Sequence, residues 1–525
     1  MTKPGKTLDL ERVLLLALYT AYAGTFFVQV FFFYPSEERS YLAHFADDAF
    51  YYFEIVRHFV ESGVSTFDTL TTTNGYHPLW FLLLVLLGIV CNVDSPAFFA
   101  AVLSLDFALC LVGSFALRRV LARIYGSTAL AQLLAAFYFF TAFRFSAAGM
   151  EIALFFGLAP LLLNVYLDEQ DSPSVRKAVV FGLLASLVIL SRLDSVLLVA
   201  LLILFVAPVV RRRTHWHGLL VHGIAFGLGG LLLPLYLAQN LWFHGHVLPV
   251  SGLAKGMSSE WGLYWPAIEQ LFRVRGMWDV IVPAGGAVAV LLAVPAGARI
   301  SRREFAAAPV LLFALLFFPI TAVRSQWHLW PWYYYPIVLA LPFALATIAS
   351  ACATAFFRRP DLVSPGVTRV MLFAMCFIFV ALGTVRSLAR PAERNTIYTA
   401  SMEIADFAET HPGIYAMGDR AGLVGFLLDQ PVLHLEGLVA NRQFLSHIAR
   451  ERDLIEVLRE YKVQYYIATN PEAKGENCWS FAEPHRPGPR APRMRGQLCA
   501  APIASLEKGG VVTLIFRIDA LEPQR

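Results

Sequence analysis

The chain has few charged residues for its length. Only 15% of its 525 residues are Asp, Glu, Lys or Arg, whereas soluble domains have about 25%. Hydrophobic residues make up 57% of the sequence, and the mean hydropathy is +0.59. The apolar runs are unbroken and have the length of helices, whereas the strands of a membrane barrel need only about 10 alternating residues. The composition therefore excludes an ordinary soluble domain and predicts a mainly α fold, a polytopic helical membrane bundle.

Several other signals are missing from the sequence. The formal net charge is only +4, and the arginines gather at the ends of apolar runs, so we do not expect nucleic acid as a partner. No internal repeat and no nucleotide-phosphate loop stands out. The six cysteines show no metal-ligand spacing. Cys478 and Cys499 lie in the polar C-terminal region, where they could form a disulfide if that region is extracytoplasmic.

The apolar runs predict about eleven membrane spans, each of which takes about 20 residues. Clusters of Arg and Lys at alternate ends of these runs mark the cytoplasmic side. The run 78–93 is shorter, about 24 Å as a helix, so we expect it to be re-entrant or juxtamembrane; a twelfth crossing is the alternative. The predicted spans are 12–33, 97–117, 128–148, 150–168, 177–191, 193–210, 218–241, 279–298, 305–323, 332–356 and 369–389.

Two domains are predicted. Residues 1–390 form the transmembrane domain, with a first outer loop at 34–78. After about residue 390 the composition turns polar, and short β-rich pieces such as 463–468 alternate with helical stretches such as 399–409. Residues 391–525 are therefore expected to form a small α/β domain, which the alternation of the basic clusters places on the extracytoplasmic side.

The first outer loop carries an acidic pair, Asp47 and Asp48, at the start of an amphipathic helical pattern. One interpretation is that the pair only caps this helix, because acidic residues suit the first turn. The other is catalytic: one carboxylate takes a proton from an acceptor hydroxyl, and the other binds the acceptor or a divalent cation. A neighbouring like charge would raise one of the two pKa values.

The same loop contains the polar turn TTTNGYH, which predicts substrate-binding roles for Asn74, Tyr76 and His77. Asn74-Gly75 is a favoured turn dipeptide. Pro78 holds His77 in extended geometry. Two interpretations of His77 remain open. It is either an interfacial histidine bonded to the backbone, or a substrate contact or metal ligand.

Three ionisable sites interrupt apolar runs: Glu151, Arg192 with Asp194, and Arg324 with His328. The predicted topology places all three near the outer face, where the first outer loop also lies. Charge inside a membrane is costly and usually faces a cavity or a partner. We therefore expect these residues to bind substrate, although Arg192 and Asp194 could simply pair to close a helix end.

A phosphate site is predicted from Lys255 in an outer loop, acting as a point charge, and from Arg324, acting as a fork. The alternative for Lys255 is a solvated or headgroup-bound lysine. The aromatic cluster from Trp327 to Tyr335 is typical of an interfacial belt. Its density also suits a platform for a sugar or lipid, in which Tyr333 and Tyr334 are candidates.

The order of these motifs resembles the C superfamily of glycosyltransferases (GT-C), in particular a bacterial branch of it. That superfamily includes protein O-mannosyltransferases, aminoarabinose transferases of lipid A and mycobacterial arabinofuranosyltransferases. The resemblance covers nearly the whole chain. It rests on DDAFYYFEI at Asp47, TNGYHPLW at Thr73, GME at Gly149, SRLD at Ser191, FHGHVLPVSGLAK at Phe243, WPWYYYP at Trp330, GDRAG at Gly418 and HLEGL at His434.

The resemblance implies an inverting transfer from a polyprenyl-phosphate sugar to a hydroxyl of a glycan, lipid or protein acceptor, at the outer face of the bacterial cytoplasmic membrane. It implies that Asp47 or Asp48 is the base and that Lys255, Arg324 and His328 stabilise the departing phosphate. The chain has Asp-Asp where the superfamily motif has Asp-Glu, and metal use varies in the superfamily. A divalent cation as cofactor is therefore left open.

Two other classes of function fit parts of the sequence. A transporter or flippase of lipid-linked sugars would call for related halves with interrupted helices, and no such repeat is seen. A non-catalytic membrane protein could use the C-terminal domain to bind glycans. Activity of the purified protein with polyprenyl-phosphate sugars separates these classes from a glycosyltransferase.

Overall fold

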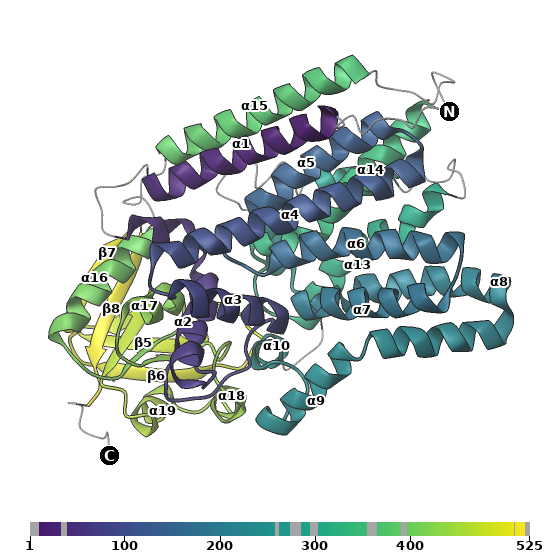
Figure 1. Ribbon diagram of the computed structural model, residues 1–525. Helices are drawn as coiled ribbons and strands as arrows, with labels where there is room; N and C mark the ends of the chain where they lie inside the picture. Colours follow the sequence, from purple (N-terminus) through teal and green to yellow (C-terminus); the bar gives the residue numbers. More distant parts are fainter. Residues whose placement is uncertain are drawn as a thin grey trace, which may run out of the picture.

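The computed structural model shows a bundle of helices with a smaller α/β domain at one end (Figure 1). Helices satisfy their own backbone hydrogen bonds, so they are the natural form for long apolar runs in a membrane. The predicted fold, a helical membrane bundle with a small C-terminal α/β domain, is confirmed. The structure describes residues 10–32, 39–146, 148–257, 262–272, 285–293, 303–353, 365–389, 396–508 and 510–519.

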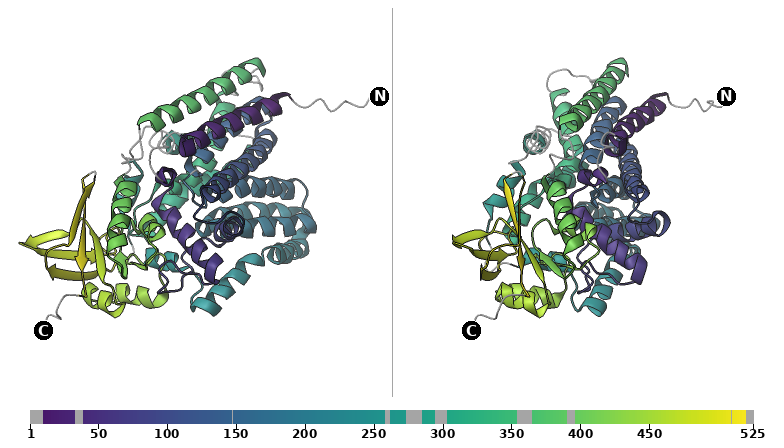
Figure 2. Two further views of the ribbon diagram at one scale, coloured as in Figure 1. Left: turned by 60° about the vertical axis from the view of Figure 1, so that its left-hand side comes forward. Right: turned by 90° about the vertical axis from the view of Figure 1, so that its left-hand side faces the viewer.

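Within these residues, six helical segments are long and apolar enough to cross a membrane. Two further apolar helices, α1 (Leu10–Phe32) and α15 (Pro365–Ala389), lie side by side along one flank of the bundle (Figures 1 and 2). The six segments are α4 (Pro96–Tyr125), α5 (Thr128–Ser146), α6 (Ile152–Asp171), η2 with α8 (Leu193–Ser195, Val196–Gly229), η3 with α13 (Glu304–Ala307, Ala308–Arg324) and η4 with α14 (Pro331–Tyr334, Tyr335–Cys352).

The predicted spans differ from the helices at two places. Spans 193–210 and 218–241 are separated by a break at His215, where the backbone leaves the helical conformation within α8, and the second span is divided between the end of α8 at Gly229 and α9 (Leu232–His244). The predicted span 279–298 lies largely outside the described residues, of which 285–293 are helical.

The other bundle helices are short. α7 (Val175–Ser191) packs against α6 and α8. α3 (Pro78–Cys91) has 14 residues, about 21 Å, which is less than the hydrocarbon thickness of about 30 Å. That α3 does not cross the membrane stays a prediction.

α2 (Asp47–Ser62) joins the two parts of the molecule. Its apolar side is buried, and it contacts both α3 and α17 (Ala421–Leu427) of the C-terminal domain. The helix ends at Gly63, whose φ of 73° is a left-handed conformation that favours glycine. Short helices complete this end of the bundle: η1 (Ser40–His44), α10 (Val250–Gly256) and α11 (Trp265–Phe272).

The C-terminal domain begins with α16 (Thr396–Thr410) and contains two sheets. The larger has the order β2-β1-β3-β8-β7, in which β1 is parallel to β2 and β3, and β8 is antiparallel to β3 and β7. The predicted boundary at residues 390–391 lies outside the described residues. The strands of the larger sheet are β1 (Tyr415–Met417), β2 (Val432–His434), β3 (Tyr465–Thr469), β7 (Ala504–Lys508) and β8 (Val511–Arg517).

The smaller sheet has the order β4-β5-β6 and carries the disulfide. Its strands are β4 (Glu472–Gly475), β5 (Cys478–Glu483) and β6 (Met494–Cys499). Cys478 and Cys499 stand opposite each other in the register of β5 and β6 and are bonded. Two further helices, α18 (Arg442–Ala449) and α19 (Leu454–Glu460), pack in the same domain.

Candidate active site

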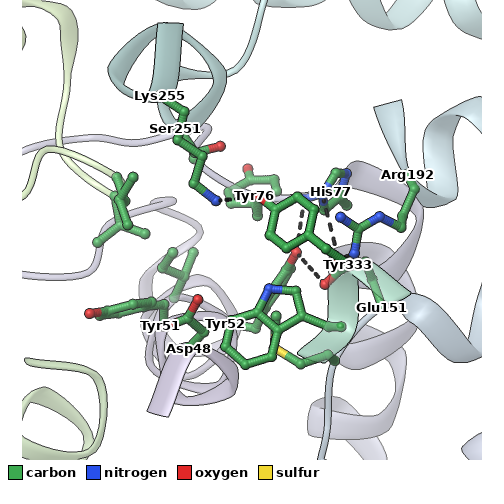
Figure 3. A pocket seen from close by; sticks show the side chains of 16 residues that line it. Asp48, Tyr51, Tyr52, Tyr76, His77, Glu151, Arg192, Ser251, Lys255 and Tyr333 are labelled. Carbon is green, nitrogen blue, oxygen red and sulfur yellow. Dashed lines mark hydrogen bonds and ion pairs between the residues drawn. The ribbon is translucent and has the colours of Figure 1, made fainter. Parts of the chain in front are cut away.

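A cavity lies where α2, the loop before α3, α10 and the C-terminal domain meet (Figure 3). Its wall combines ionisable and aromatic side chains from segments far apart in the sequence. Polar residues from several distant segments therefore meet at one cavity. The predicted site residues that line it are Asp48, Tyr76, His77, Glu151, Arg192, Lys255 and Tyr333.

The two residues of the acidic pair point to different places. Adjacent residues of a helix project about 100° apart. The carboxylate of Asp47 accepts hydrogen bonds from the backbone amides of Gly422 (3.1 Å) and Leu423 (2.9 Å) at the start of α17. Asp48 lines the cavity instead. Asp47 therefore belongs to the contact between the domains, and Asp48 is the carboxylate of the pair that a substrate can reach.

Burial shifts both acids toward their neutral form. It raises the pKa of Asp47 to about 6, although the two amides lower it. Burial also raises the pKa of Asp48 to about 7, and the nearby Lys255 lowers it. At neutral pH, Asp48 is thus close to half ionised, which suits a group that takes and releases a proton.

Lys255 supplies a positive charge on the other side of the cavity (Figure 3). Its Nζ donates to the hydroxyl of Tyr333 at 3.1 Å. Burial lowers the pKa of Lys255, but Tyr333 and Asp48 outweigh burial, and the pKa is raised. In the described part of the chain, no carboxylate lies within ion-pair distance of this Nζ, so the ammonium keeps donors for a ligand.

Arg192 is held in a buried network of acids and rings. Its NH1 donates to Glu151 at 2.8 Å, and its Nε and NH2 donate to the two oxygens of Asp194 at 3.1 Å each. Its guanidinium also lies over the rings of Tyr335 (4.5 Å) and Tyr333 (5.0 Å). The Arg192–Asp194 pair therefore closes the turn after α7, as one interpretation of the sequence proposed. Arg192 also reaches the cavity wall.

Glu151 and His77 form the next part of this wall. The hydroxyl of Tyr52 donates to Glu151 at 3.1 Å and accepts from the backbone amide of His77 at 3.2 Å. His77 Nδ1 accepts from the amide of Leu193 at 3.4 Å, and its Nε2 lies 3.6 Å from Glu151. Burial lowers the pKa of His77. A neutral His77, with its hydrogen on Nε2, therefore holds the turn before α3 against Glu151.

Asn74 positions the cavity without lining it. Its side-chain oxygen accepts from the amide of Val250 at 3.0 Å, and its nitrogen donates to Asn240 at 3.1 Å. Val250 begins α10, the helix that carries Lys255. Asn74 thus ties the turn of the first outer loop to the helix that presents the ammonium group.

Arg324, His328 and Tyr334 lie outside the cavity, as Asp47, Asn74 and Asp194 do. Arg324 ends α13 and is exposed. The ring of His328 lies 6.1 Å from that of Tyr264. Tyr334 is buried against Phe145, because the turn η4 directs Tyr333 and Tyr334 to different sides. These positions do not support the expected roles of Arg324 and His328 at the phosphate, or of Tyr334 as a platform.

Sequence reasoning assigned no role to several cavity residues. Tyr51, Tyr52 and Ser251 line the wall beside the predicted residues, and Trp332, a member of the predicted aromatic cluster, lines it as well. The C-terminal domain adds the segment 438–439. Leu438 is the last residue of HLEGL, a motif in which a histidine and a glutamate interrupt an apolar stretch, and that interruption was the available signal.

The part of the chain that the structure describes contains no set of side chains arranged to bind a metal ion. No three His, Cys, Asp or Glu side chains converge there as metal ligands. The oxygen ligands that Mg²⁺ and Ca²⁺ prefer are present near Asp48, but they do not form a cage. We therefore assign no residue to a divalent cation.

Comparison with known proteins found similarity only among solved structures. No family model and no curated protein matches the chain. The chain is similar to ArnT from Cupriavidus metallidurans bound to undecaprenyl phosphate, with 15% identity and a TM-score of 0.49 over 89% of this chain and 93% of that one.

Two structures of an archaeal enzyme are also similar. They are the oligosaccharyltransferase AglB from Archaeoglobus fulgidus in complex with an inhibitory peptide and a dolichol-phosphate (11% identity, TM-score 0.47, 87% and 70% of the two chains), and the oligosaccharyltransferase of the same organism with zinc and sulfate (12%, 0.44, 86% and 67%). We draw no function from likenesses at this level and turn to the residues of the cavity.

Proposed function

We propose that the chain is a membrane glycosyltransferase that moves a glycosyl group from a polyprenyl-phosphate donor to an acceptor hydroxyl, with inversion. The observation that carries the proposal is the pairing of Asp48 and Lys255 across one cavity. A base and an anion-binding cation are the two groups that such a transfer needs. The cavity lies at the end of the bundle where the C-terminal domain sits.

Asp48 acts as the base in this proposal. The acceptor hydroxyl gives its proton to the Asp48 carboxylate while its oxygen attacks the anomeric carbon. The bond from that carbon to the phosphate oxygen breaks in the same step. Asp47 is engaged with α17, so one carboxylate of the pair faces the substrate. A single displacement with one base inverts the anomeric configuration, whereas retention needs a second carboxylate as nucleophile.

Lys255 holds the departing phosphate. The phosphate already carries charge and gains more as the glycosidic bond breaks, so a fixed ammonium stabilises the transition state. Tyr333 orients Nζ through the hydrogen bond of 3.1 Å, and Ser251 lies one turn earlier on α10 with its hydroxyl in the same wall. Arg192 lies over the ring of Tyr333 and helps to position it, while its own donors are bound to Glu151 and Asp194.

The outer face of the bacterial cytoplasmic membrane is the proposed location. The disulfide Cys478–Cys499 favours an oxidising compartment for the C-terminal domain and hence for the adjoining cavity. Basic residues gather at the other end of the bundle, where Arg123 lies in the last turn of α4 and Arg211 to Arg213 lie within α8. Such residues favour the cytoplasmic side.

The test is transfer by the purified protein in lipid nanodiscs, supplied with labelled polyprenyl-phosphate sugars and envelope glycan acceptors. We expect release of polyprenyl phosphate together with a labelled glycoside. Movement of the lipid-linked sugar across the bilayer without transfer would support a flippase and overturn the proposal. Binding of glycans with neither activity would support a non-catalytic glycan-binding protein.

A further inference from the structure

The C-terminal domain brings buried acidic side chains to the neighbourhood of Asp48. Asp419, Glu436 and Glu483 are 8%, 5% and 4% exposed. Burial raises the pKa of Glu436, and the charges of Asp419, Glu483 and Asp48 raise it further, so these four groups act on one another. The cluster therefore lies within electrostatic range of the proposed base, although it belongs to another domain.

The sheet topology explains why two of these residues meet. Asp419 follows β1 by two positions, and Glu436 follows β2 by two positions. β1 and β2 are adjacent and parallel, so their carboxyl ends lie at the same edge of the sheet. Ligands of open α/β sheets bind at such an edge. Here the edge faces the cavity, because residues 438–439, which directly follow Glu436 and Gly437, line its wall.

Asp419 and Glu436 differ in their partners. Arg486 binds Asp419 at 2.7 Å. Glu436 Oε2 lies 3.9 Å from Nε2 of His434, and burial lowers the pKa of His434 to about 3, so that ring is neutral. Glu436 Oε1 is buried and has no hydrogen-bond partner in the described part of the chain. A buried carboxyl oxygen of this kind is matched by a ligand that donates a hydrogen bond to it.

The aromatic wall narrows the class of ligand. Trp332 lines the cavity and stacks on Trp330, with ring centroids 5.9 Å apart and planes 22° apart. Arg486 lies over the outer ring of this pair, 5.5 Å from the centroid of Trp330. Sugar rings place their apolar C–H face on indoles and donate their hydroxyl groups to carboxyl oxygens. Burial favours the neutral form of Glu436 and Arg486 is engaged with Asp419, so this wall offers hydrogen bonds to neutral hydroxyl groups and, among the described residues, no unengaged cation for an anionic acceptor.

We propose that Glu436 and Trp332 form the acceptor subsite and that the acceptor is a neutral sugar. This inference rests on the proposed transferase. One hydroxyl of the sugar donates to Glu436 Oε1, the ring lies on Trp332, and a neighbouring hydroxyl gives its proton to Asp48 as its oxygen attacks the donor. The charges of the cavity then separate the substrates: the phosphate of the donor lies toward Lys255, and the neutral acceptor lies toward the C-terminal domain.

The test measures binding without requiring catalysis. Saturation-transfer NMR of the full chain in nanodiscs is recorded with neutral methyl hexosides and pentosides and with the matching methyl uronides. We expect at least one neutral glycoside to bind and its uronide to bind at least tenfold more weakly. Glu436→Gln should weaken the neutral glycoside at least tenfold, because the amide replaces an acceptor oxygen. Glu507→Gln makes the same change at an exposed position of β7 and should alter binding less than twofold.

Binding of undecaprenyl phosphate checks that Glu436→Gln is folded, and it should equal that of the unaltered chain. The proposed subsite is wrong if Glu436→Gln binds glycosides as tightly as the unaltered chain does. It is also wrong if uronides bind more tightly than neutral glycosides, or if no glycoside binds. Transfer with an unchanged acceptor KM in Glu436→Gln also overturns it and leaves the transferase standing. If neutral glycosides bind in a way that depends on Glu436, but no polyprenyl-phosphate sugar supports transfer, the subsite is supported and the proposed transferase activity is contradicted.

Discussion

The carboxylate of Asp47 accepts a hydrogen bond from the backbone amide of Gly422 at 3.1 Å, and this contact joins the membrane domain to the C-terminal domain. A Cβ at Gly422 would collide with the backbone carbonyl of Asp47. The two segments therefore approach each other only because residue 422 is glycine. The contact fixes the C-terminal domain directly beside Asp48, so domain docking and catalysis share one helix, α2.

Asp47→Ala is expected to weaken domain docking rather than the chemical step. The change removes a carboxylate that accepts hydrogen bonds from two backbone amides, so we expect a loss of about 2 kcal/mol in the stability of the docked state. Differential scanning fluorimetry and limited proteolysis of the C-terminal domain measure it. Gly422→Ala should act in the same direction through the collision with Asp47. Unchanged unfolding and proteolysis in both variants would show that this contact does not hold the domains together.

The rate of transfer should depend on pH through Asp48. The carboxylate is the active form, and burial raises its pKa to about 7. Activity is therefore lost as the pH falls through about 7, and at pH 6 kcat/KM should be about tenfold below its plateau. The profile is measured by initial rates between pH 5 and pH 9 at constant ionic strength. A profile that stays flat from pH 5 to pH 7 contradicts Asp48 as the base.

Lys255→Met should weaken donor binding and shift the pH dependence of the transfer rate. Loss of a charge-assisted contact to phosphate predicts an increase of about 10- to 100-fold in the KM for the donor. Lys255 also lowers the pKa of Asp48, so its removal should shift the acidic limb to higher pH. Arg324→Met is the matched control, because Arg324 is exposed outside the cavity. Equal donor KM values for the two variants would remove Lys255 from the phosphate site.

The disulfide should stabilise the C-terminal domain. Cys478 and Cys499 are separated by 21 positions, and closing a loop of this size stabilises a domain by about 3 kcal/mol. Cys478→Ser with Cys499→Ser should lower the unfolding temperature of this domain while the bundle unfolds as before. Mass spectrometry without reduction checks that the bond exists in the purified protein. Two free thiols there would contradict the proposed extracytoplasmic location.

The sequence predicted the membrane bundle because the length of an apolar run can be read from the sequence without any knowledge of tertiary contacts. It also predicted that Asp48, Glu151, Arg192 and Lys255 belong to one site, because each is costly in its setting and the basic clusters assign a side to each. The different orientations of Asp47 and Asp48 could not be predicted. They depend on where α17 docks, and that segment lies more than 370 positions away in the chain.

Other parts of the site needed the tertiary structure for similar reasons. Arg324 has the residue type and the side of the membrane that a phosphate site needs, but the end of α13 directs it to the outside. Glu436 gave only a weak signal, because short parallel strands carry no information about which edge faces another domain. The pairing of β1 with β2 places it beside Asp419, and the docking through Asp47 places both near Asp48.

The role of Asp48 as the base of a glycosyl transfer is tested by the transfer rates of two single variants. Initial rates of transfer from a labelled polyprenyl-phosphate sugar are compared for the unaltered chain, Asp48→Asn and Asp47→Asn in nanodiscs, with undecaprenyl phosphate binding as the check on folding. We expect a loss of about 10²- to 10⁴-fold in kcat for Asp48→Asn with lipid phosphate binding retained, and a kcat within about tenfold of the unaltered chain for Asp47→Asn. Full transfer by Asp48→Asn would contradict this role of Asp48.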